Sequence, residues 1–395
     1  MIYLDYQATT PLAPEARDSM LRWLDGPDGT GFGNPHSPHR MGRMAAAAIE
    51  AGRLDNDRMR LSFDFEDAHV RYISTMAPIT QGRGSAVLHG NAFEVTLDSG
   101  LIGDIVLSEG FVDMPRLNPK GAMARYGGVA RGEAADILAL IDEDPLYLVS
   151  DYGLDPTLVG GEGEMRFEIR RAMLTEVDPE DIPFFIEGRF NNASLDIPGT
   201  DYALSEGDVV ISASQEGLEA SGTARLFDAP VQVVWRERFG LPDGEPSTRI
   251  GLETTINART LDQFNMPARR YLDGAIRIAA EAVSDGLEFR SVDIEADLVD
   301  ALIEAPGGVW SKQAGAPGRA TLSLTQTEDG GFDLDSIRLE ADGAALEASA
   351  RIGANGALRQ IEADRIYVDN LMEVAGRITP ADVVGEPLRM RLTGQ

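Results

Sequence analysis

Side chains that could form a covalent intermediate are scarce in this chain of 395 residues. Cysteine is absent, so a thiolate nucleophile, a persulfide and a thiolate metal site are chemically excluded. The two lysines are Lys120, in Asn-Pro-Lys-Gly, and Lys312, in Trp-Ser-Lys-Gln. Both contexts are typical of turns, whereas a Schiff-base lysine needs a shaped and charged pocket around it. The sequence therefore predicts no catalytic residue and no cofactor site.

Two groups of side chains could in principle hold a metal ion. His36 and His39 are three residues apart, which is not the i, i+4 spacing of a helical ligand pair, and no carboxylate cluster accompanies them. Asp293, Glu295 and Asp297 would share one face of a strand and could gather a calcium ion. They belong to no calcium-loop motif, and we interpret them as a solvated acidic face. We predict no metal site.

The N-terminal residues carry two motifs at a fixed interval. Residues 3–10 read Tyr-Leu-Asp-x-x-Ala-Thr-Thr, and residues 33–43 read Gly-Asn-Pro-x-Ser-x-His-x-x-Gly-Arg. Together they resemble the N-terminus of cysteine desulfurases, the NifS/IscS-like class V aminotransferases. The resemblance implies pyridoxal phosphate on a lysine and a cysteine nucleophile later in the chain. Here the pattern stops near Arg53, so residues 1–53 are predicted to be a truncated, inactive fragment, and the chain to be a chimera.

The charge of the chain lies almost entirely beyond this fragment. The formal net charge is −30, and residues 1–53 contribute five basic and six acidic side chains to it. This charge argues against nucleic acid as a partner, because phosphate binding requires clustered Lys and Arg. Docking on an anionic membrane surface is disfavoured for the same reason.

No stretch reaches the roughly 20 apolar residues of a membrane span. Met1 leads directly into the strand motif and not into a signal peptide. We therefore expect no membrane span in the chain and, from the sequence as written, a cytoplasmic location by default.

From Leu54 onward the dominant hydrophobic period is two. Leu61, Phe63 and Phe65 alternate with polar residues, and so do many later runs. Residues typical of turns separate these runs. The predicted turns include Asp-Gly pairs such as Asp342–Gly343, and also Gln81–Gly84, Asp98–Gly100 and Gly160–Gly163. Short helices are predicted over residues 133–142, 145–152 and 261–272. The predicted fold is mainly β: a long curled antiparallel sheet, a repeated β-groove, with few short helices.

A degenerate unit, x-Gly-x-Ala/Gly-x-Leu before an alternating strand, recurs along the chain. It occupies residues 82–88, 161–167, 219–226 and 318–324, and it is interspersed with Pro145-Leu, Asn265-Met-Pro and Val309-Trp-Ser-Lys312. In this order the motifs resemble the AsmA-like envelope proteins, specifically the YhdP-like branch, over residues 57–395. The resemblance implies a periplasmic β-groove that moves phospholipid without catalysis. We therefore divide the chain into residues 1–53 and residues 54–395.

An apolar groove of this kind would be lined by alternating side chains. The predicted lining consists of Phe93, Val95, Leu97, Ile105, Leu107, Met165, Phe167, Ile169, Leu252, Ile256, Ile276, Ile278, Phe289, Leu322, Leu324, Ile337 and Leu339. Its partner would be phospholipid acyl chains, stabilised by about 0.8 kcal/mol per buried methylene.

The alternative for the same residues is an ordinary sandwich core. The alternative function is a pyridoxal-dependent desulfurase or aminotransferase, present only as its fragment. Exposed sheet edges leave edge-to-edge self-association open.

Overall fold

The computed structural model describes residues 60–394, apart from 73–74, 145–146, 148, 151–153, 179–180, 198–200, 243–244, 265–267, 287, 355–357 and 380–388. The predicted desulfurase-like fragment, with His36 and His39, lies outside the described residues, and so does most of the helix predicted over 145–152.

Strands make up most of the described chain. The first twelve are β1 (Arg60–Val70), β2 (Ile79–His89), β3 (Ala92–Ile102), β4 (Ile105–Met114), β5 (Met123–Glu133), β6 (Val159–Ala172), β7 (Phe184–Asp196), β8 (Ala203–Ser214), β9 (Gly217–Leu226), β10 (Ala229–Arg238), β11 (Thr248–Asn257) and β12 (Leu272–Asp285). The others are β13 (Glu288–Asp297), β14 (Ala301–Glu304), β15 (Ser311–Lys312), β16 (Gly318–Gln326), β17 (Phe332–Ala341), β18 (Ala344–Ile352), β19 (Leu358–Val368), β20 (Met372–Thr379) and β21 (Arg389–Gly394).

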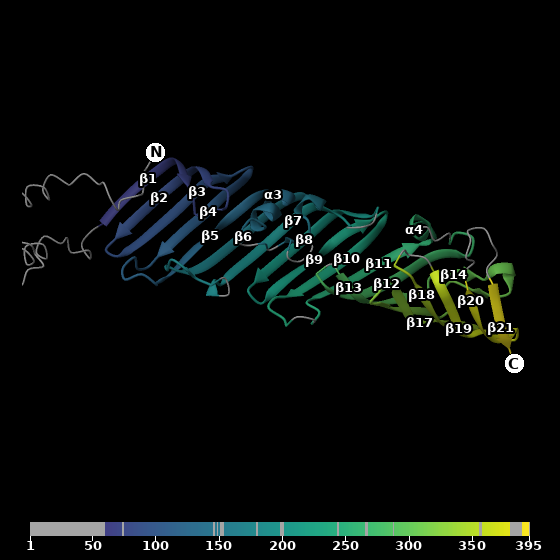
Figure 1. Ribbon diagram of the computed structural model, residues 1–395. Coiled ribbons are helices and arrows are strands. Elements are labelled where there is room, and N and C mark those ends of the chain that lie inside the picture. The colour runs from purple at the N-terminus through teal and green to yellow at the C-terminus, as the bar shows by residue number, and fades with distance from the viewer. Residues whose placement is uncertain are drawn as a thin grey trace, which may run out of the picture.

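The strands form an antiparallel meander in which each strand pairs with the strands before and after it (Figure 1). This order is broken once: β13 pairs with β16 and not with β14. The intervening strands β14 and β15 pair with each other, and β14 also pairs with β12, so that together they form a small flap beside β12. The predicted mainly β, antiparallel fold with few short helices is confirmed. Its predicted curl is not: β1 pairs only with β2 and β21 only with β20, and the sheet between them is long, open and uncurled.

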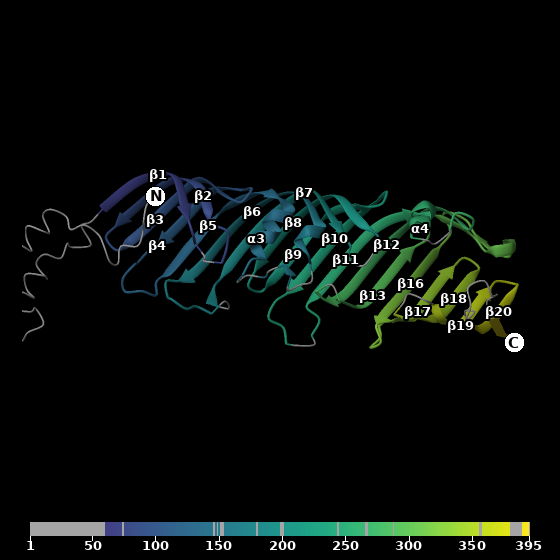
Figure 2. The same ribbon diagram turned by 45° about the horizontal axis from the view of Figure 1, so that its top comes forward.

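Two short helices lie against the sheet in the connections between strands (Figure 2). Helix α3 (Ala134–Ile141) confirms the helix predicted over 133–142. Helix α4 (Ala258–Gln263) begins before the predicted 261–272, because the side chain of Asn257 caps it by accepting hydrogen bonds from the N–H groups of Arg259 and Thr260. Two 3-10 turns, η3 (Pro156–Leu158) and η5 (Pro306–Gly308), also lie in the connections between strands.

Three glycine-containing segments predicted as turns lie inside strands. Gln81–Gly84 belongs to β2, Asp98–Gly100 to β3 and Gly160–Gly163 to β6. In β2 and β6 these residues accompany shifts of register. Gly161 shows why: its φ is 104°, and a Cβ there would lie 2.7 Å from the carbonyl oxygen of Asn192. Glycine at such a position marks a bulge, which bends a strand without ending it.

Candidate functional site: the apolar face of the sheet

The register of the strands places one row of mainly apolar residues across most of the sheet. Directly opposed residues of an antiparallel pair point to the same face, so a row can be followed from strand to strand. This central row consists of Leu107, Ala130, Met165, Gly188, Ile211, Ala220, Trp235, Ile250, Ala282, Val292, Leu324, Leu334, Ala350 and Ile361. At the usual strand spacing of about 4.8 Å, the row from β4 to β19 is roughly 60 Å long.

Neighbouring rows on the same side have the same character. One of them contains Phe190, Val209, Gly222, Val233, Leu252, Ala280, Ile294, Leu322, Ile337, Ala348 and Ala363. Another contains Val231, Thr254, Ile278, Ala296, Ala320, Leu339, Leu346, Ile366 and Val374. We call the side that carries these three rows the apolar face.

All of the predicted lining residues lie on the apolar face. Five of them are buried, namely Ile105, Leu107, Met165, Ile256 and Ile276. Phe289 is exposed and the others are half-buried. The face is therefore neither the solid interior of a closed sandwich nor a bare surface.

The buried lining residues lie where connections cross the apolar face. Ile137 of α3 is fully buried in one cluster with Ile105, Leu107, Met165 and Phe190. A second cluster joins Ile256 and Ile276 with residues from the β13–β14 connection and the flap, while Leu261 of α4 packs against it. Between and beyond these clusters, lining residues such as Leu252, Leu322 and Leu324 belong to neither.

A short polar row interrupts the apolar face near one end of β10, β11 and β12. Glu237, Thr248 and Ser284 are directly opposed and all are buried. Thr248 Oγ1 donates to Glu237 Oε2, and Trp235 Nε1 donates to the same oxygen at 3.2 Å. Glu237 Oε1 and Ser284 Oγ have no hydrogen-bond partner in the described structure. Sequence reasoning missed this group because its three members are adjacent only through the strand register.

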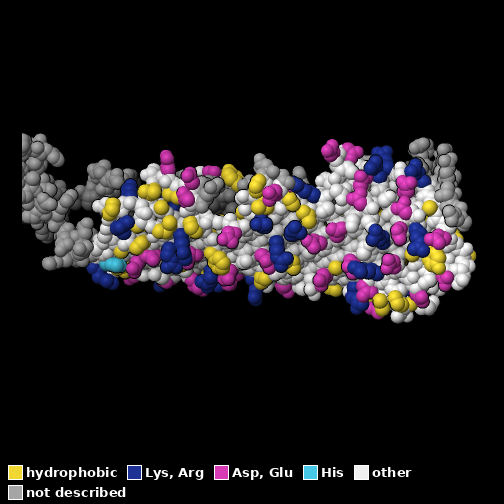
Figure 3. All heavy atoms as spheres, turned by 90° about the horizontal axis from the view of Figure 1, so that it is seen from below, with side chains coloured by type: hydrophobic (Ala, Val, Ile, Leu, Met, Phe, Trp, Pro, Cys, Tyr) yellow, Lys and Arg dark blue, Asp and Glu magenta, His cyan; other side chains and the backbone are white. Residues whose placement is uncertain are grey.

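The opposite face is covered by cross-strand ion pairs. Arg131 Nε lies 2.6 Å from Glu164 Oε2, and Arg249 Nη1 lies 3.1 Å from Glu281 Oε1. Seen from below in Figure 3, acidic and basic side chains lie beside one another along the length of the molecule. Individual exposed pairs contribute little stability, but together they keep this face in water.

One pair on this charged face predicts a pH dependence. Hydrogen bonds from Arg125 and then Arg170 lower the pKa of Glu168 from 4.5 to about 2. Since the folded pKa is depressed, the stabilisation is present above about pH 4.5 and is lost as the pH falls through about 2. Glu168→Gln should therefore lower the free energy of unfolding by at most about 1 kcal/mol at pH 7.

Urea unfolding at pH 7 and at pH 2 measures this effect, with Glu187→Gln on the adjacent strand as the control. The difference between Glu168→Gln and the unchanged chain should disappear at the lower pH. An undiminished difference would contradict the assigned cause.

The residues weighed for covalent or metal chemistry have other roles. Lys120 is exposed. Lys312 is buried, and its Nζ donates to the carbonyl oxygens of Ala301 at 2.9 Å, Gln313 at 3.1 Å and Val299 at 3.3 Å. It thus ties β15 to β14 and to the β13–β14 connection. The predicted turn setting for Lys312 is wrong, since it belongs to β15.

The three acidic residues of β13 each have a separate partner. Ser323 Oγ donates to Asp293 at 2.6 Å, Arg319 pairs with Glu295, and Arg277 pairs with Asp297. Across the described part of the chain, no group of three His, Asp or Glu side chains is arranged to hold a metal ion.

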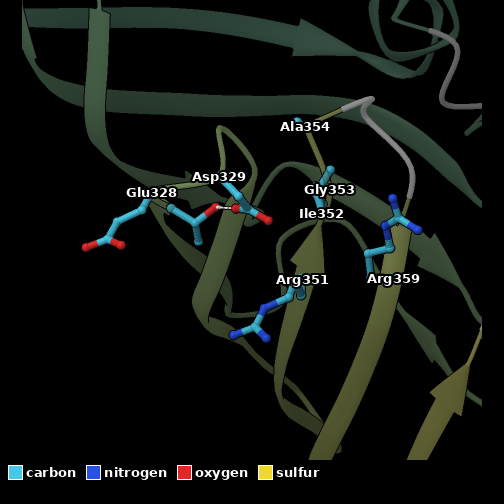
Figure 4. Close-up of a pocket in the computed structure, with 8 residues that line it drawn as sticks. Glu328, Asp329, Arg351, Ile352, Gly353, Ala354 and Arg359 are labelled. Atoms are coloured by element: carbon cyan, nitrogen blue, oxygen red, sulfur yellow. Dashed lines mark hydrogen bonds between the residues drawn. The ribbon is translucent and has the colours of Figure 1, made fainter.

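A cavity of about 690 Å³ lies at one margin of the sheet, between the β16–β17 turn and the ends of β18 and β19 (Figure 4). It is lined by Thr327, Glu328, Asp329, Arg351, Ile352, Gly353, Ala354 and Arg359. Sequence reasoning did not identify it, because its lining residues come from separate segments that only the strand register brings together.

Comparison with known proteins finds relatives of two kinds. The YhdP protein family matches residues 42–383, beginning upstream of the predicted boundary at Arg53. Cysteine desulfurase IscS of Rickettsia bellii (strain OSU 85-389) is 49% identical over 55 residues, which are 14% of this chain and 12% of that protein. Cysteine desulfurase IscS of Rickettsia akari (strain Hartford) is 49% identical over 53 residues, again 12% of its length. These matches confirm both resemblances, and the chain spans only about an eighth of the curated relatives.

No solved structure matches the chain. Among the helices of the described residues, none has the length and apolar character needed to cross a membrane.

Proposed function

Because the chain belongs to the YhdP protein family, we propose that its β region handles phospholipid without catalysis, carrying acyl chains along the apolar face. Family membership supports an envelope protein of the lipid-transport type; phospholipid as the cargo and the periplasm as the compartment are our proposals.

The observation that carries the proposal is the continuity of the apolar rows across the strands. An acyl chain has no polar group to satisfy, so it needs only apolar surface in contact. Each methylene moved out of water contributes about 0.8 kcal/mol. Where neighbouring strands leave this surface uncovered, as they do around Leu252, Leu322 and Leu324, a chain can move from one strand to the next with little change in free energy.

The half-burial of the lining supports this use of the face. A surface of leucine and isoleucine that is only partly covered costs free energy in water, and extended apolar patches on soluble proteins mark interaction sites. Acyl chains would cover it without needing complementary hydrogen bonds.

The alternative, a pyridoxal-dependent desulfurase, is supported by no feature of the described residues. Its matches involve only 53 to 55 residues, and a cysteine nucleophile is absent from the sequence.

Photocrosslinking on β11 tests the proposal. Leu252 lies on the apolar face, and Glu253 is exposed on the opposite face. With a benzophenone amino acid at position 252, irradiation in the presence of vesicles of radiolabelled phospholipid should label the chain. At position 253 the labelling should stay at background.

Equal labelling at the two positions would contradict the proposal, as would none at position 252 when the substituted chain retains its β-sheet circular dichroism. Either result would mean that the apolar face is not where acyl chains bind.

A further inference from the structure

The cavity at the margin of β16–β19 has walls of opposite charge. Asp329 comes from the β16–β17 turn, and Arg359 from β19; Figure 4 shows them on opposite sides of the cavity, with Gly353 between them. A volume of about 690 Å³ is within the usual range for small-molecule sites.

The negative wall is fixed in place. Thr327 Oγ1 donates to Asp329 Oδ1 at 2.5 Å. This hydrogen bond, together with one from the backbone N–H of Gly331, lowers the pKa of Asp329. The carboxylate is therefore ionised at neutral pH, and the exposed Glu328 lies beside it.

The positive wall has spare binding capacity. Arg351 is already engaged, since its Nε and Nη2 donate to the two carboxylate oxygens of Asp333 at 2.7 and 3.1 Å. Arg359 has no ion pair among the described residues. Its Nε lies so close to Gly353 that a Cβ there would be 2.7 Å away, so glycine is what lets the guanidinium lie along the cavity wall.

The cavity also adjoins the apolar face. Ile352, one of its lining residues, is directly opposed to Phe332 and lies two residues beyond Ala350 of the central row. A ligand in the cavity could therefore extend an apolar tail onto Ala350 and Leu334.

We propose that this cavity binds the headgroup of a zwitterionic phospholipid, with the phosphate at Arg359 and the ammonium group at Asp329. Arginine is suited to the phosphate because its planar fork of N–H groups matches phosphate oxygens. The Asp329 carboxylate favours a headgroup that also carries a positive charge over a purely anionic one. The inference rests on the proposed function and specifies its lipid class.

Binding to vesicles tests the assignment. Neutral carrier vesicles would contain either phosphatidylethanolamine or phosphatidylglycerol with identical acyl chains. The unchanged chain should capture phosphatidylethanolamine about tenfold better, the factor expected for one charge-assisted contact. Asp329→Asn should reduce this preference severalfold without lowering capture of phosphatidylglycerol. Arg359→Gln should instead reduce capture of both lipids severalfold, because both carry the phosphate.

The matched control is Arg338→Gln, which removes an exposed arginine of β17 outside the cavity. It should leave the preference unchanged. A preference that survives Asp329→Asn, capture that survives Arg359→Gln, or an equal loss caused by Arg338→Gln would overturn the headgroup site.

Two further outcomes separate this inference from the proposed function. If no phospholipid is captured at all, the proposed function fails; if lipids are captured without headgroup preference, only the headgroup site fails. Soluble glycerophosphoethanolamine should compete weakly, since it lacks acyl chains. Competition as strong as that of the lipid would overturn the lipid assignment in favour of a small-molecule site.

Discussion

Aspartate at Val233 is expected to reduce phospholipid capture at least about tenfold, whereas aspartate at Val234 leaves it unchanged. The two valines are consecutive, both half-buried, and on opposite faces of β10. Val233 is directly opposed to Gly222 and Leu252 on the apolar face. A carboxylate there would be forced against acyl chains, and burying an unpaired charge costs several kcal/mol, so even a largely relieved cost of 1.4 kcal/mol gives a factor of ten.

A substitution that unfolds the chain would also abolish phospholipid capture. A second pair of substitutions at Val233 and Val234, which perturbs the structure less, therefore accompanies the aspartate pair. Val233→Thr keeps the shape of valine and adds one hydroxyl, and it should weaken capture severalfold. Val234→Thr, whose opposed neighbours are Ser221 and Gly251, should have no effect.

Vesicle co-flotation measures capture, and circular dichroism confirms that each variant retains its sheet. If the substitutions at Val233 and Val234 weaken capture equally, the apolar face is not the binding surface.

The positions of the strands, and the side of the sheet to which each side chain points, could be predicted from the sequence. Both depend on the local alternation of apolar and polar residues. Phe93, Val95 and Leu97 alternate with Glu94, Thr96 and Asp98, and all of them lie in β3 as that pattern requires. The helix over 133–142 was equally predictable, since Ala134 and Ile137 repeat at helical spacing on the buried side of α3.

The features that sequence reasoning predicted wrongly or missed depend on contacts between residues distant in sequence. Glycine was read as a turn signal at Gly161, where it instead relieves a clash with Asn192 on the next strand. Lys312 was assigned to a turn, but its burial depends on the carbonyls of Val299 and Ala301. The row of Glu237, Thr248 and Ser284 exists only through the register of three strands.

The curl was wrong for a related reason. Alternation shows that one face must be covered, but it does not show what covers it. The connections carrying α3 and α4 cover part of the apolar face, so the sheet need not curl around those residues to bury them. Their sequences show short helices, but not where on the sheet they lie.

The contribution of α3 to this covering can be measured at Ile137. Its side chain is fully buried against Ile105, Leu107, Met165 and Phe190, and its Cδ1 lies 2.9 Å from where a Cβ on Gly163 would be. Ile137→Ala should therefore remove a large contact and leave a cavity under the helix. We expect a loss of about 2–5 kcal/mol in the local free energy of unfolding, the usual cost of truncating a buried isoleucine to alanine.

Because each strand contacts mainly its neighbours, the loss should be local. Chains whose strands contact mainly their neighbours unfold in parts. Hydrogen exchange, which reports the stability of each part, therefore measures the effect better than a single melting temperature. Amides of α3 should exchange faster by a factor of about 30 or more, whereas those of β17 and β18 should be unchanged. Leu138→Ala, which removes a half-buried side chain outside the cluster, is the control and should have a much smaller effect. If Ile137→Ala accelerates exchange uniformly from β1 to β20, the sheet unfolds as one unit and α3 is part of a global core. If exchange in α3 is unchanged, the stability of the helix does not depend on its contact with the apolar face.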